Sequence, residues 1–123
     1  MSDQSEPVTP VLFRVHRRPG THGDDVTAVF PAEPAKYSGY DMTCYASIGQ
    51  HGACSFGWYR ETRPATPEEY ADLKRELESA PYHYRLKVYR KIMQRHRQAF
   101  DAAQRAARQS LVDNPAGAPW TTA

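Results

Sequence analysis

Four short segments in which apolar and polar residues alternate precede the first helix signal, and this order most constrains the fold. The segments are residues 11–17, 26–30, 41–48 and 53–60. Alternation with a period of two is typical of strands that bury one face. Turn-forming residues separate the segments, so we expect consecutive antiparallel strands. Gly57 lies inside the fourth segment and indicates a bulge there.

The remainder of the chain predicts a helix, a fifth strand and a second helix. Thr66-Pro67-Glu68-Glu69 combines an N-cap, a proline at the first helical position and a capping-box glutamate, and it predicts a helix that runs to Ser79. Residues 82–90 alternate again, with Leu86 and Val88 on one side. From about Lys91 to Val112 the apolar period is helical. Its broad face holds Ile92, Met93, His96, Ala99, Phe100, Ala103, Ala107 and Leu111.

These elements predict an α+β fold: a small antiparallel sheet of about four to five strands, one packed helix and a long basic C-terminal helix. We expect a flexible N-terminal segment at residues 1–10 and the α+β domain at residues 11–92. A basic amphipathic helix at residues 93–113 and a flexible tail at residues 114–123 follow.

The cellular compartment is inferred from features that the sequence lacks. The first residues show neither the basic region nor the apolar core of a signal peptide. No apolar run has the length that a bilayer requires. The chain has only two cysteines, Cys44 and Cys54, which is too few for a secreted disulfide framework. We therefore expect a cytoplasmic protein with reduced thiols and no membrane interaction.

Charge is distributed unevenly along the chain. Residues 1–81 hold 8 Lys or Arg and 12 Asp or Glu, whereas residues 82–123 hold 8 and 2. Four arginines lie near one side of the C-terminal helix: Arg90, Arg97, Arg105 and Arg108. A solvated face, an acidic protein partner, a homodimer through this helix and nucleic-acid phosphates all remain open interpretations.

Cys44, His51 and Cys54 are potential soft-metal ligands within eleven residues. A structural zinc site usually has a close cysteine pair, which is absent here. A nucleophilic cysteine needs a base within reach, and only His51 is near in sequence. We favour two packed thiols and a turn histidine, and we expect no metal, no cofactor and no catalytic residue. Residues 49–52 are interpreted as a turn; a turn at Gln50-His51 would place Cys44 opposite Gly57.

Aromatic residues cluster between residues 37 and 59. One face of a sheet with one helix cannot bury all of them, so some are expected at the surface. Exposed Tyr and Trp are typical anchors of protein interfaces. We expect Trp58 or Tyr59 to lie exposed beside the turn. The predicted partner-binding residues are Tyr37, Tyr40, His51, Trp58 and Tyr59.

Two stretches carry a resemblance to known proteins: TCYASIGQHGACSFGWY at residues 43–59 and TRPATPEEYADL at residues 62–73. With VLFR at residues 11–14 and AVFP at residues 28–31, they are similar to a family of small uncharacterised proteins. Bacteriophages and other mobile elements of bacteria encode this family. The resemblance covers roughly residues 11–92 and implies no biochemical activity.

The sequence and the resemblance together predict a non-enzymatic accessory protein of a phage or mobile element. Such a protein would bind a host protein complex and regulate or inhibit it, as an inhibitor of the anti-CRISPR type does with a host-defence complex. One alternative is a nucleic-acid-binding protein that uses the basic helix. Another is a small-ligand binder or enzyme at the Gly49–Gly52 turn.

Overall fold

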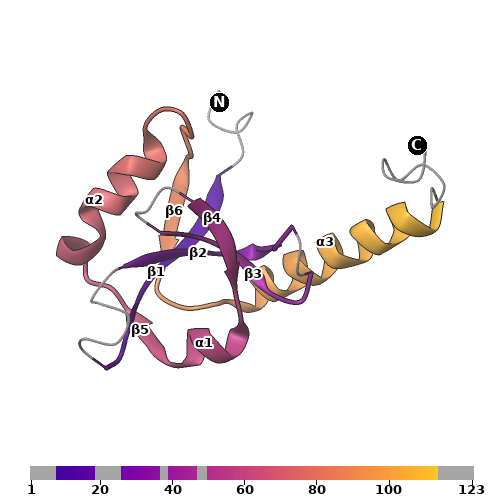
Figure 1. Ribbon diagram of the computed structural model, residues 1–123, viewed down its shortest axis with the longest axis horizontal. Helices are drawn as coiled ribbons and strands as arrows, with labels where there is room; N and C mark the ends of the chain where they lie inside the picture. Colours follow the sequence, from indigo (N-terminus) through magenta and orange to yellow (C-terminus); the bar gives the residue numbers. More distant parts are fainter. Residues whose placement is uncertain (1–7, 19–25, 37–38, 47–49, 114–123) are drawn as a thin grey trace.

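The computed structural model describes residues 8–18, 26–36, 39–46 and 50–113, and it confirms the α+β class (Figure 1). Residues 1–7 and the tail from residue 114 lie outside the described residues, so the expected flexibility of both ends stays a prediction. The elements are β1 (Thr9–His16), β2 (Thr27–Pro34), β3 (Met42–Ala46), β4 (Gln50–Cys54), α1 (Phe56–Arg60), β5 (Thr62–Pro64), α2 (Pro67–Glu78), β6 (Leu86–Tyr89) and α3 (Gln94–Asp113).

The sheet is mostly antiparallel, with strand order β4-β3-β2-β1-β5. β6 also pairs with β1, but in parallel, and Leu12 lies opposite Tyr89. The predicted small antiparallel sheet is confirmed, and the parallel pairing of β6 with β1 is a feature that the sequence did not indicate. The reason is topological: α2 carries the chain back along the sheet, and a strand that follows such a crossover can enter beside β1 in the same direction. β5 has only three residues, too few to show alternation in the sequence.

Residues 53–60 do not form the expected fourth strand. β4 ends at Cys54, and residues 56–60 form the short helix α1. The Ser55 side chain accepts a hydrogen bond from the Trp58 backbone N–H at 3.0 Å, which caps the new helix. These residues therefore form a capped helix although their alternating pattern predicted a strand. The bulge inferred from Gly57 is absent because Gly57 lies within α1.

α2 follows its sequence signals closely. The Glu69 backbone N–H donates to Thr66 Oγ1 at 3.2 Å, and the Thr66 backbone N–H donates to Glu69 Oε1 at 2.8 Å. This reciprocal pair is the predicted capping box. The helix buries Leu73 and Leu77 and ends at Glu78, one residue before the expected end.

The sheet has an apolar core on both faces. On one face, Val11, Phe13 and Phe30 pack with Leu73 and Leu77 of α2. On the other face the buried residues are Leu12, Val29, Met42, Cys54 and Phe100, with Phe56, Trp58 and Tyr59 of α1 packed against them. We expected one packed helix. Because both alternating sets of β1 are apolar at residues 11–13, two faces need covering, and α1 and α3 cover the second.

Only the first part of α3 packs on the sheet. His96 and Phe100 are buried and Ala103 is half-buried, but every side chain from residue 105 to residue 109 is exposed. Ala99 and Ala107, expected on the packed face, are exposed as well. Figure 1 shows the helix continuing outward past the sheet. Among the helices of the described residues, none has the length and apolar character needed to traverse a bilayer.

Candidate partner-binding surface

Tyr40 is the most exposed large hydrophobic residue among the described residues, at 79% of its full accessibility. It lies in the loop between β2 and β3, which follows a register shift between Phe30 and Pro34 within β2. The Ala35 backbone N–H donates to the Asp41 carbonyl at 2.8 Å and closes this loop. The loop therefore presents Tyr40 on a short, anchored segment. Tyr37, also predicted to bind a partner, lies outside the described residues.

A cleft of about 420 Å³ separates this loop from α3. Lys36 and Tyr40 line it from the loop, and Gln104, Ala107 and Arg108 line it from the helix. The Gln104 side-chain amide donates to the Gly39 carbonyl and joins the two walls. The cationic side chains of Lys36 and Arg108 and the exposed phenol of Tyr40 thus line the same cleft.

A second cleft, of about 450 Å³, lies on the other side of the same loop. Pro34, Ala35 and Lys36 line both clefts, and His51 lines only the second. His51 Nε2 lies 3.1 Å from the Tyr84 hydroxyl, and its ring lies 4.9 Å from the Tyr45 ring. We call Lys36, Tyr40, His51, Gln104 and Arg108 together the Lys36 surface.

Trp58 and Tyr59 do not lie where the sequence placed them. Both belong to α1 and are half-buried against the second face of the sheet. The Tyr59 hydroxyl accepts a hydrogen bond from the Ile92 backbone N–H at 3.1 Å. The Arg14 guanidinium carbon lies 4.5 Å from the Tyr59 ring centroid. The expectation of exposed anchors at these two positions was wrong, because helix formation turns both rings toward the core.

The two thiols and His51 lie on opposite faces of the sheet. Gln50, His51 and Gly52 belong to β4, so the predicted turn at these residues was wrong. Cys44 pairs with Gly52 and Tyr45 pairs with His51, which sets Cys44 and His51 on different sides. Cys44 and Cys54 share the face that carries Met42. A common metal ion or a nucleophile–base pair is therefore geometrically excluded for these three residues, and no other metal-binding cluster occurs in the described ranges.

Cys44 and Cys54 contact each other and differ in acidity. The hydrogen bond from Cys54 lowers the pKa of the Cys44 thiol, an effect that burial partly opposes. The hydrogen bond with Cys44 and burial both raise the pKa of the Cys54 thiol. Both cysteines are free thiols in the structure. Cys44 is thus the more acidic and the more exposed thiol of the pair.

The predicted arginine row does not form one contact surface. Arg90, Arg97, Arg105 and Arg108 are all exposed. Arg108 lines the first cleft, whereas Arg97 stacks on Phe56 with its guanidinium carbon 4.6 Å from the ring centroid.

Two residues of the Lys36 surface were not singled out from the sequence. Gln104 precedes Arg108 by four residues, and this spacing already places both on one side of a helix. Lys36 had no comparable signal, because its position depends on a loop that folds against α3.

No protein-family model, no curated protein and no solved structure matches the chain. The Lys36 surface is therefore interpreted from its geometry and chemistry alone.

Proposed function

We propose that the chain is a non-enzymatic protein that binds a protein partner through the Lys36 surface. The observation that carries this proposal is the exposure of Tyr40, 79%, at the edge of a 420 Å³ cleft. A tyrosine supplies a large rigid contact area and a polar end, and interfaces use such residues as anchors.

The chemistry of the cleft favours an acidic partner. Lys36 and Arg108 both line it, and Gln104 adds an amide. Cations beside an aromatic anchor complement carboxylates and accelerate the encounter with an acidic surface. Because Arg108 lies on the exposed part of α3, a partner that fills the cleft contacts both the loop and the helix.

The resemblance to proteins of phages and mobile elements adds a cellular context to the proposal. The partner would be a protein complex of the bacterial host, met in the cytoplasm, and binding would regulate or inhibit it. A host-defence complex is the example that this setting favours, by analogy with other small inhibitors of mobile elements. Homodimerisation through α3 stays a separate prediction, which sedimentation of the purified chain tests.

A capture experiment with a matched control tests the surface. The tagged chain is expressed in a bacterial host and recovered from lysate, with and without nuclease. The Tyr40→Ala, Arg108→Ala variant is expected to lose a stoichiometric protein that the wild type retains after nuclease treatment. The control is Asp72→Ala, Arg75→Ala, which removes an exposed ion pair of α2 and leaves the net charge unchanged.

Equal recovery of that protein by the cleft variant and the wild type would contradict the proposal. Loss in the control as well as in the cleft variant would also contradict it, because the contact would then not be confined to the Lys36 surface. Circular dichroism of both variants shows whether each is folded. Both substitutions of the cleft variant alter exposed side chains, so we expect little change in stability.

A further inference from the structure

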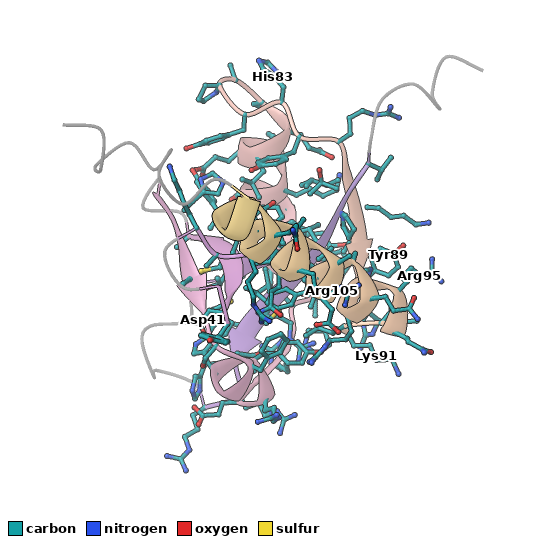
Figure 2. The ribbon with its side chains drawn as sticks, turned by 90° about the vertical axis from the view of Figure 1, so that its right-hand side faces the viewer. Asp41, His83, Tyr89, Lys91, Arg95 and Arg105 are labelled. Atoms are coloured by element: carbon teal, nitrogen blue, oxygen red, sulfur yellow. The ribbon has the colours of Figure 1, made fainter. Side chains whose placement is uncertain are left out.

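The junction between β6 and α3 carries a dense positive charge. Residues 85–97 contain no Asp or Glu, and the nearest acidic residues in sequence are Glu78 and Asp101. Six basic residues occur in this stretch, and all six are exposed: Arg85, Lys87, Arg90, Lys91, Arg95 and Arg97. Figure 2 shows Tyr89 and Arg95 next to each other beside the start of α3, with Lys91 below them. We call residues 85–97 the junction surface.

Ion pairs of the carboxylates in the described part of the chain do not involve Lys87, Lys91 or Arg95. Three of these pairs are local: Arg63 with Glu69 at 2.9 Å, Lys74 with Glu78 at 3.0 Å and Arg75 with Asp72 at 2.9 Å. The positive charge of Lys87, Lys91 and Arg95 is therefore available to an external anion.

Tyr89 positions two of these cations. The Lys87 ammonium lies 5.6 Å and the Arg95 guanidinium carbon 5.9 Å from the Tyr89 ring centroid. The ring is itself fixed by the edge-on His96 ring at 4.4 Å and by the pairing of Tyr89 with Leu12. A ring face attracts a cation without neutralising it, so both head groups are held in place with their N–H donors still available.

The start of α3 adds to the positive potential. The first turn contains no acidic residue, although acidic side chains are favourable at that end of a helix. Arg95 and Arg97 occupy it instead, against the helix dipole. A bound anion would offset this unfavourable interaction between the two arginines and the helix dipole. The same position therefore favours anion binding at the junction surface.

We propose that the junction surface binds the phosphate backbone of nucleic acid. Neither cleft beside Lys36 includes Lys87, Lys91 or Arg95, and Tyr89 is only half-buried among its cations. An acidic protein partner would be expected to insert an anchor into a pocket, whereas phosphate contacts need only exposed and oriented donors. This inference is independent of the Lys36 surface and of the partner proposed for it.

Fluorescence anisotropy with a labelled DNA of about 20 nucleotides, single-stranded and as a duplex, tests the inference. If three phosphates are contacted, affinity between roughly 50 and 200 mM salt is expected to fall about 40-fold for the duplex and about 20-fold for the single strand. The test variant is Lys87→Gln, Lys91→Gln, Arg95→Gln. The control is Arg63→Gln, Lys74→Gln, Arg75→Gln, which removes the same number of positive charges from α2 and its neighbour.

The test variant is expected to bind at least about 10-fold more weakly than the wild type, and the control within about 2-fold of it. Equal weakening in both variants would overturn the proposal, because binding would then follow net charge alone. Displacement of the labelled DNA by polyglutamate as effectively as by unlabelled DNA would assign the surface to acidic protein instead. Lys91→Gln alone alters an exposed side chain and gives a second readout if the triple variant fails to fold.

Discussion

Arg14 donates two hydrogen bonds to Thr62, from Nε to the hydroxyl oxygen and from Nη2 to the carbonyl oxygen, both at 2.9 Å. A third bond reaches the Arg90 carbonyl at 2.5 Å. Arg14 is 5% exposed, and burial lowers the pKa of its guanidinium. The side chain thus joins β1 to β5 and to the end of β6 without a carboxylate partner among the described residues.

Arg14→Met is expected to lower the free energy of unfolding by about 2–4 kcal/mol, because two buried hydrogen bonds to Thr62 and a part-buried one to the Arg90 carbonyl are lost. Urea denaturation followed by tryptophan fluorescence measures the change. Arg18→Met is the control, since Arg18 is exposed beyond the end of β1. A loss in Arg14→Met no larger than that in the control would show that the network contributes little.

Tyr45→Phe is expected to destabilise the protein by about 1–3 kcal/mol, because the Tyr45 hydroxyl donates to the Glu76 carboxylate across the interface of β3 and α2. The same bond raises the pKa of Tyr45. The unfolded chain therefore ionises first, and the stability that the bond provides falls as the pH rises above the usual tyrosine pKa of about 10. Urea titrations of wild type and Tyr45→Phe at neutral and alkaline pH measure both effects, with Tyr40→Phe as the exposed control.

We expect His96 to lower the stability of the folded protein at mildly acidic pH. Burial, and then the charge of Arg95, lower the pKa of His96. Its Nδ1 accepts a hydrogen bond from the Met93 backbone N–H at 3.0 Å, which requires the neutral ring. The unfolded chain takes up a proton near pH 6.5, so stability is expected to fall as the pH decreases from about 7.5 to about 5.5. Thermal unfolding of His96→Leu should show a smaller fall over this range, and an equal fall would assign the effect to other groups.

Cys44 is expected to react with iodoacetamide well before Cys54. Cys44 has the lowered pKa and is half-buried, whereas Cys54 is buried with a raised pKa. Because the thiolate is the reactive form, the rate at Cys44 should also rise at lower pH than the rate at Cys54. Mass spectrometry of peptides after timed alkylation measures both rates. Alkylation of Cys54 first would contradict the expected order of acidity and exposure of the two thiols.

The sequence predicted best the elements whose signals are local. Thr66 and Glu69 lie three residues apart and form the capping box that their spacing indicated. The parallel pairing of β6 with β1 joins residues more than seventy positions apart, and no local pattern encodes it. The sequence did not predict α1, because residues 53–60 alternate as a strand does. In the structure the Ser55 side chain accepts a hydrogen bond from the Trp58 backbone N–H and caps a helix instead.

The candidate surfaces were predicted only in part, for a related reason. Tyr40 was expected at the surface and lies there, and the clefts beside it place His51 near the same loop. The approach of Arg108 to Tyr40 depends on the docking of α3 against the loop before β3, which is a tertiary contact. Trp58 and Tyr59 were misplaced because their exposure was inferred from a strand that does not form.

The incomplete packing of α3 divides its backbone amides into two populations. Amides near His96 and Phe100 lie over the core, so exchange with deuterium there requires the sheet interface to open. Amides between residues 105 and 109 belong to turns whose side chains are all exposed, and they exchange through local fraying. Arg108 therefore lies on a helical segment that is held mainly by its own backbone hydrogen bonds, whereas the part of the helix that holds Phe100 is also held by the core.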